Sequence, residues 1–205
     1  FLSLKVDAYT VNGYDCWLTG GRESYNDYVY VRNALKHGYE RTTAETTYQW
    51  TVRSSLGDGT RSVADEQYIN SCVKYGDIVY LQLNYMDNRW LSGGRDRGND
   101  GVYTENALGT TYERTTAAST YQWIVRSSSG DGTRSFADKQ EGSCVHYEDI
   151  LYLQVNNVNN RWLSGGGYID EEVYALDVTS TFWEDTPNPK WTVQKWPIVD
   201  ETRSI

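Results

Sequence analysis

Hydrophobic and polar residues alternate along the chain in short runs, and these runs return in a fixed order. One run reads Asp-Ile, an aliphatic residue, then Tyr-Leu-Gln, and occupies residues 77–82 and 149–154. Alternation places two aliphatic side chains of each run on one face of a strand: Val79 and Leu81, and Leu151 and Leu153. The first copy is expected at residues 4–8, with Val6 and Ala8 facing inward. Helical periods are scarce, so the pattern predicts short β-strands.

Three further runs follow the first one in each copy. They are a Trp-Leu run that ends in Gly-Gly, a Val-Tyr run and a Trp-x-Val run. The Trp-Leu run begins at three equivalent positions: Trp17, Trp90 and Trp162. A period of this length is typical of a repeat architecture. The chain therefore contains three imperfect repeats of roughly 70 residues, approximately 1–70, 71–142 and 143–205.

Four strands repeated three times predict one pseudo-threefold β-trefoil domain over residues 1–205. Six strands would close a barrel and six would form hairpins that cap one end, which removes exposed sheet edges. The repeat layout resembles that of β-trefoil lectins. The Gln-Trp pairs at 49–50 and 122–123 resemble the Gln-x-Trp signature of ricin-type repeats, without its spacer. A β-prism, with three four-stranded sheets about one axis, is the alternative fold.

The recurrent apolar residues divide into core positions and one less certain set. Period-2 alternation assigns to the core the following residues: Trp50, Trp123, Trp191, Val52, Val125, Val193, Leu18, Leu91 and Leu163. Trp17, Trp90 and Trp162 alternate with those leucines and should face away from the barrel interior. They either pack beneath the hairpin cap or present an aromatic plane on which a sugar ring stacks.

Recurrent polar residues are the better candidates for ligand recognition. Copies one and two share an Arg after Gly-Gly, an Asn after the third strand and a Tyr-Glu-Arg-Thr-Thr loop, and copy three lacks all of them. Carboxylate, amide and guanidinium groups suit the hydroxyls of a sugar. Together with Trp17 and Trp90, the candidate glycan-binding residues are Arg22, Asn33, Tyr39, Glu40, Arg95, Asn106, Tyr112 and Glu113. The alternative is that Glu40 with Arg41, and Glu113 with Arg114, form surface ion pairs.

Composition and charge narrow the choice of partners. The chain has 205 residues, of which 18 are Tyr and 8 are Trp, and its formal net charge is −9. Aromatic residues favour strands and contact surfaces, whereas an acidic chain repels a phosphate backbone. No apolar run approaches the roughly 20 residues that span a bilayer. We therefore expect neither a nucleic acid partner nor a membrane span.

The three cysteines, Cys16, Cys72 and Cys144, cannot all pair within one chain. Cys72 and Cys144 are equivalent in two repeats, and threefold-related positions lie far apart unless they sit on the axis. We therefore expect no intrachain disulfide. The cysteines are then either small buried hydrophobic residues, or they take part in an intermolecular disulfide or a ligand contact. The chain starts at Phe1 rather than Met, so it looks either processed or trimmed. Removal of a secretory signal is one explanation, and on it we expect a secreted protein.

Catalysis has little support in the sequence. Neither His37 nor His146 recurs, and no Ser-His-Asp order, zinc spacing or phosphate loop is present. The Gly-Asp-Gly inserts are read as polar turns, although Asp58 and Asp65, or Asp131 and Asp138, are residues that calcium could use.

We therefore expect a non-enzymatic protein without cofactor or metal. The predicted function is that of a secreted lectin with repeated weak sites for glycans or glycoproteins. A structural or matrix protein that self-assembles or accompanies another protein is the alternative, and a toxin or inhibitor on the same scaffold also stays open.

Overall fold

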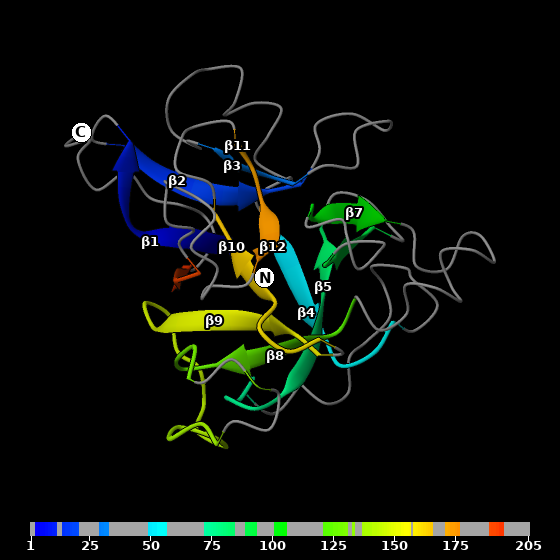
Figure 1. The fold of residues 1–205 in the computed structure, drawn as a ribbon, viewed down its shortest axis with the longest axis vertical. Helices are drawn as coiled ribbons and strands as arrows, with labels where there is room; N and C mark the ends of the chain where they lie inside the picture. The colour runs from blue at the N-terminus through cyan, green and yellow to red at the C-terminus, as the bar shows by residue number, and fades with distance from the viewer. Residues whose placement is uncertain are drawn as a thin grey trace.

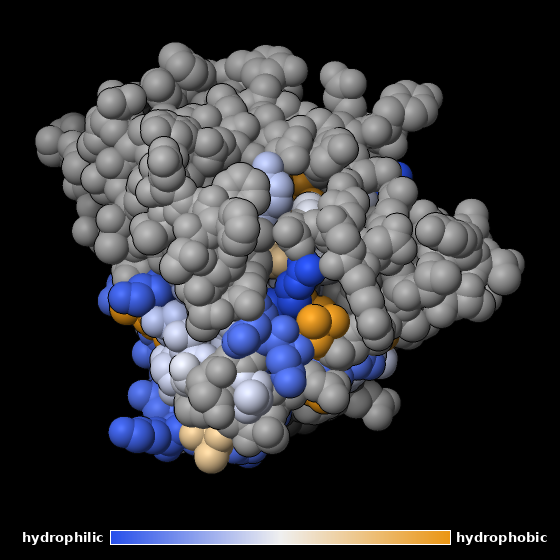
Figure 2. Space-filling model, viewed as in Figure 1, coloured by the Kyte–Doolittle hydropathy of each residue, from blue (hydrophilic) through white to orange (hydrophobic). Residues whose placement is uncertain are grey.

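The computed structural model is an all-β protein of antiparallel strands (Figure 1). The structure describes residues 3–11, 14–20, 29–32, 49–56, 72–84, 89–93, 101–105, 121–130, 133, 137–156, 158–165, 171–176 and 189–194. Within these ranges there is no α-helix, and so no helix that could cross a membrane. On the face drawn in Figure 2, hydrophilic residues make up most of the described surface.

The described residues form thirteen strands, most of them three to six residues long. In chain order they are β1 (Ser3–Val11), β2 (Tyr14–Thr19), β3 (Tyr30–Arg32), β4 (Trp50–Arg53), β5 (Ile78–Leu83), β6 (Trp90–Ser92), β7 (Tyr103–Glu105), β8 (Trp123–Arg126), β9 (Ile150–Val155), β10 (Trp162–Ser164), β11 (Glu171–Glu172), β12 (Tyr174–Leu176) and β13 (Trp191–Gln194).

Six of these strands form a continuous antiparallel series around the core, and we call them the barrel strands. Its order is β1, β13, β9, β8, β5 and β4, and each strand is hydrogen-bonded to the next. β8 and β9 lie side by side in the lower half of Figure 1, and the β1–β2 pair lies at its upper left. The inward-facing side chains are Leu, Val and Trp, which form one buried cluster. The core role predicted for the nine recurrent residues is confirmed for all but Val52, which is partly buried against this cluster.

The same strand register occurs in three places along this series. A Trp-x-Val strand pairs each time with an aliphatic strand, with these partners: Val52 with Leu81, Val125 with Leu153, and Val193 with Leu4. Leu4 therefore occupies the position that we expected Ala8 to hold, so our alignment of the first strand was wrong by four residues. A shift by an even number of residues keeps every side chain on the same face, which is why alternation alone could not detect it.

Three hairpins adjoin the barrel strands: β2 with β3, β6 with β7, and β10 with β12. The pairing of residues between the two strands is equivalent in all three. Their opening tryptophans pair with equivalent residues: Trp17 with Arg32, Trp90 with Glu105, and Trp162 with Leu176. Just before the third strand of each set, Val29, Val102 and Val173 form a closed ring of backbone hydrogen bonds. Val29 N–H donates to the Val102 carbonyl at 3.3 Å, Val102 to Val173 at 3.0 Å, and Val173 back to Val29 at 2.8 Å. The hairpins thus meet around one point, where all three valines are buried.

Three tryptophans connect the barrel to these hairpins. The indole Nε1–H of Trp50, Trp123 and Trp191 donates to the carbonyls of Leu18, Leu91 and Leu163, at 3.3, 3.0 and 2.8 Å respectively. Each indole is fully buried, so its N–H requires such a partner to offset the loss of water. A recurrent Trp therefore fixes both the packing of the barrel and the position of a hairpin above it.

A disulfide joins Cys72 to Cys144, so the prediction of no intrachain disulfide is wrong. The two Cα atoms are 5.5 Å apart, although 72 residues separate them in sequence. Segments 72–75 and 142–145 run antiparallel to one another, with hydrogen bonds from Val145 N–H to the Val73 carbonyl and from Tyr75 N–H to the Ser143 carbonyl. Equivalent residues of two repeats can meet when their segments converge over the end of a barrel. We had expected such residues to lie far apart.

Candidate functional site

Eight of the ten predicted site residues lie outside the described residues. They are Arg22, Asn33, Tyr39, Glu40, Arg95, Asn106, Tyr112 and Glu113. The described strands end directly beside two of them: β3 ends at Arg32, and β7 ends at Glu105. These two terminal residues pair with Trp17 and Trp90, which hold equivalent positions in copies one and two.

The remaining two predicted site residues, Trp17 and Trp90, are buried. Their exposed fractions are 3% and 2%, and that of the equivalent Trp162 is 0%. Tyr80 contacts Trp90 edge to face, with ring centroids 6.3 Å apart, and Tyr152 contacts Trp162 in the same way at 6.2 Å. This burial supports the packing interpretation, because no ring face is open for a sugar to stack on.

All three of these hairpin tryptophans bury an indole N–H that has no hydrogen-bond partner within the described part of the chain. The barrel tryptophans Trp50, Trp123 and Trp191 differ, because each donates to a leucine carbonyl. Alternation in the sequence separated the barrel tryptophans from the hairpin tryptophans correctly, but it could not show that the side chains of both sets would be buried.

Polar residues that recur within the strands have structural partners. Arg53 Nε donates to Gln82 Oε1 at 3.2 Å, and Arg126 Nε donates to Gln154 Oε1 at 3.4 Å. The side-chain amide of Asn84 donates to Gln49, and that of Asn156 donates to Gln122 in the same way. Arg89 donates to the Thr104 carbonyl, and its equivalent Arg161 donates to the Ala175 carbonyl. The backbone carbonyls of these two arginines accept from the N–H groups of Leu83 and Val155. These polar residues hold the framework together and need no ligand to explain their recurrence.

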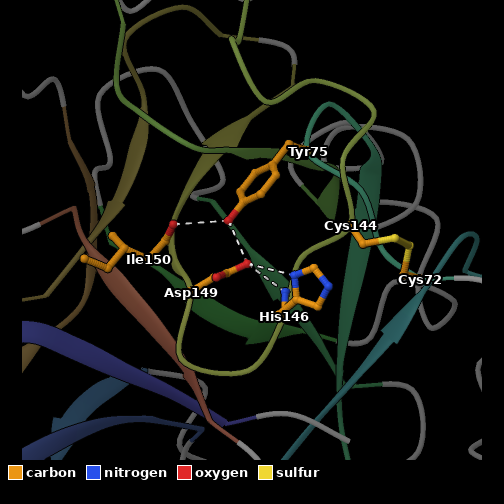
Figure 3. Close-up of polar contacts among 6 residues, drawn as sticks. All are labelled: Cys72, Tyr75, Cys144, His146, Asp149 and Ile150. Atoms are coloured by element: carbon orange, nitrogen blue, oxygen red, sulfur yellow. Dashed lines mark hydrogen bonds and ion pairs between the residues drawn. A yellow bond between two sulfur atoms is a disulfide. The ribbon is translucent and has the colours of Figure 1, made fainter.

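A second polar cluster lies at the disulfide-bridged end of the barrel (Figure 3). The Tyr75 hydroxyl donates toward Asp149 Oδ2 at 3.3 Å and toward the Ile150 carbonyl at 3.4 Å. The backbone N–H of His146 donates to the same carboxylate oxygen at 2.8 Å, and its imidazole Nδ1 lies 3.6 Å away. Burial, followed by the charge and the hydrogen bond of Asp149, raises the pKa of Tyr75 to about 12.

This cluster is built around a turn that occurs twice in the chain. In copy two, Lys74 N–H donates to Asp77 Oδ2 at 2.9 Å, as His146 does to Asp149. The central residue has positive φ in both turns, 95° at Gly76 and 73° at Glu148. Because copy two forms the turn without a histidine, the His146–Asp149 contact is explained as turn structure. Tyr75 with a pKa of about 12 is also poorly suited to proton transfer near neutral pH.

The calcium alternative for the Gly-Asp-Gly insert can be tested at Asp138. Its carboxylate accepts hydrogen bonds from the backbone N–H and hydroxyl of Ser127 and from the backbone N–H of Gln140. Burial alone would raise the pKa of Asp138, but these hydrogen bonds and the nearby Arg126 lower it below its usual value. Asp138 therefore ties Ser127 to Gln140, and Asp58, Asp65 and Asp131 lie outside the described residues. Among the residues that the structure describes, no group of His, Cys, Asp or Glu could hold a metal.

Comparison with known proteins defines the class of fold. No family model matches the chain, and no curated protein sequence does. In structure, however, the chain is similar to a protein of β-trefoil-like fold. That protein is the SDF2-like protein from Arabidopsis thaliana, with a TM-score of 0.52 and 11% sequence identity over 95% of this chain and 91% of the other. At this identity the likeness concerns the fold alone.

Proposed function

We propose that this chain is a β-trefoil of three repeats and that it acts as a secreted carbohydrate-binding protein. The glycan sites are assigned to the polar loops of copies one and two: Arg22, Asn33, Tyr39 and Glu40, and Arg95, Asn106, Tyr112 and Glu113. The proposal does not assign a stacking role to Trp17 or Trp90, because both are buried.

The trefoil part of the proposal is supported by contacts that occur in the same way in each of the three copies. Three strand pairs share one register, three tryptophans donate to three leucine carbonyls, and three valines close a ring of hydrogen bonds. The similarity to a β-trefoil-like structure over 95% of the chain points the same way. A β-prism would keep its three sheets separate, whereas here the series from β1 to β4 is hydrogen-bonded without a break.

One observation carries the binding part of the proposal: the framework residues recur in all three copies, whereas the polar loop residues recur in only two. Residues shared by all three copies pack the core or bond the framework, so the fold itself requires them. The Arg, Asn and Tyr-Glu-Arg-Thr-Thr set recurs in copies one and two only, and copy three forms its strands without it. Residues that the framework can omit are candidates for a role other than folding.

A secreted location is consistent with the Cys72–Cys144 disulfide, because such bonds persist mainly in oxidising compartments. Two weak sites on one rigid body would also suit a lectin, since multivalent contact with a surface raises apparent affinity without any new contact. Charged and amide side chains in each loop would bind vicinal hydroxyls through hydrogen bonds of about 1.5–3 kcal/mol each.

A glycan array tests this function directly. We expect the parent protein to bind a defined class of glycans, and the Glu40→Gln, Glu113→Gln double variant to bind them at least about tenfold more weakly. A Glu148→Gln variant is the matched control, since it removes one carboxylate from an exposed position far from both loops in sequence. Failure of the parent to bind any glycan would refute the proposal and favour a structural or matrix role.

A further inference from the structure

A cavity of about 670 Å³ opens at the disulfide-bridged end of the barrel. Its walls come from all six barrel strands, and its base is formed by the buried side chains of Val79, Leu81, Val125, Leu151, Leu153 and Val193. All six are aliphatic, and no charged side chain stands among them. The volume falls within the range of about 300–1,000 Å³ that small-molecule sites occupy.

Two segments joined by the disulfide form the rim of this cavity. Val73 and Val145 are half-buried, line the cavity and are linked to each other by a backbone hydrogen bond of 2.8 Å. Cys72 lines the cavity as well, and its bond to Cys144 holds the two segments together. The distance between the two rim segments is therefore fixed by a covalent bond as well as by a hydrogen bond.

Among the described residues that line the cavity, His146 and Tyr147 are strongly exposed, so we place its opening to solvent at this lip. The His146 side chain is 76% exposed and Tyr147 is 53% exposed, and both line the cavity. Exposure thus increases from the buried base, through the half-buried rim, to this lip. A gradient of this kind distinguishes an open pocket from a sealed packing defect.

The chemistry of the walls and the lip indicates which molecule fits. An aliphatic base offers no hydrogen-bond partner to water, so an apolar occupant gains by displacing any water held there. Two carboxylates, Glu148 and Asp149, follow the lip directly, and the chain carries a net charge of −9. Both features disfavour an anionic head group at the mouth. The imidazole and phenol at the lip offer hydrogen-bonding groups to a polar end of the ligand.

We propose that this cavity is a binding site for an uncharged aliphatic molecule, whose chain lies against the aliphatic base and whose neutral polar end reaches His146 and Tyr147. This site is separate from the glycan sites proposed above and uses none of their residues. An alkyl alcohol represents the proposed ligand class, and the alkyl carboxylate of the same length is its charged counterpart.

Binding is tested with the uncharged fluorophore N-phenyl-1-naphthylamine, followed by competition with decan-1-ol and with sodium decanoate. We expect the fluorophore to bind at one site, and decan-1-ol to displace it at a concentration at least about tenfold lower than decanoate. Absence of binding, or displacement by decanoate at the lower concentration, would overturn the proposal.

Substitutions locate the site. Val73→Trp places a large side chain at the rim and should weaken fluorophore binding at least about tenfold, whereas Val158→Trp, at an exposed position that does not line the cavity, should leave it unchanged. If Val73→Trp lowers the thermal midpoint, Val145→Met provides a smaller obstruction and should weaken binding to a lesser degree. Equal affinity in the parent and in the folded rim variants would place the fluorophore elsewhere and contradict the proposal.

Discussion

At the scale of single residues, Cys72 and Cys144 bring together two repeats that are far apart in the sequence. Closing a loop of 72 residues restricts the unfolded chain, which by the chain-entropy account stabilises the fold by about 4 kcal/mol, with typical measured values of about 2–4 kcal/mol. The bond also fixes the rim of the aliphatic cavity.

The Cys72→Ala, Cys144→Ala double variant should therefore lose about 2–4 kcal/mol of unfolding free energy, measured by urea denaturation. Reduced parent protein should lose a similar amount, which separates the covalent bond from the packing of the two side chains. A double variant as stable as the oxidised parent would show that the bond contributes nothing.

Tyr75 makes a second prediction at this scale, because its pKa is raised to about 12 by burial and by Asp149. The folded protein holds the phenolic proton more tightly than the unfolded chain, whose tyrosines titrate near pH 10. The contribution is thus fully present below about pH 10 and is lost as the pH rises toward 12. Urea titrations from pH 9 to 12 should show a steeper loss of stability in the parent than in Tyr75→Phe, and equal slopes would contradict the assignment.

The sequence could predict these residue roles only in part. Alternation placed Trp123 and Leu91 in the core correctly, because burial of one face is a local property of a strand. The disulfide was missed because it depends on where two loops converge, and no local pattern reports that distance. The structural role of Asp138 was likewise visible only from its partners Ser127 and Gln140.

At the scale of elements, the same turn is formed at residues 74–77 and 146–149 by different residues. Gly76 and Glu148 hold equivalent positions with positive φ, and their N–H groups donate to the carbonyls of Val125 and Val193 at 2.7 and 2.6 Å. Glycine adopts such a conformation at little cost, whereas a residue with a Cβ is strained there.

Gly76→Ala should therefore cost about 1–2 kcal/mol, because it adds this strain and brings a Cβ to 2.9 Å from Glu141 Cγ. Glu148→Ala is the matched variant and should change stability little, since position 148 already carries a Cβ. Thermal unfolding of both variants checks the difference. Equal effects would mean that the two turns are not equivalent.

Strand positions were predicted well where the residues alternate and poorly where they do not. The runs at 77–82 and 149–154 correspond to β5 and β9, whereas β1 was misaligned by four residues. The strand β11, with two glutamates, pairs with β3 and was not expected, because two residues of one type carry no alternation. Tertiary contact rather than local propensity creates such an element.

At the scale of the whole molecule, a framework repeated three times carries polar loops that are repeated twice. The framework was accessible from sequence because packing imposes the same Trp, Leu and Val residues on each copy. The aliphatic cavity was not, because its base consists of residues that the sequence could assign only to the core. Of the residues that we assign to glycan binding, Asn33 and Asn106 directly follow β3 and β7, whose last residues pair with Trp17 and Trp90.

The number of glycan sites is the most direct measure of this account. Isothermal titration calorimetry with the strongest-binding glycan from the array should give two sites per chain for the parent. The Glu40→Gln and Glu113→Gln single variants should each retain one site at the original affinity, because removing a charged hydrogen-bond partner costs the altered site about 1.5–3 kcal/mol. Three equal sites, or two sites unaffected by either substitution, would contradict the assignment of binding to copies one and two.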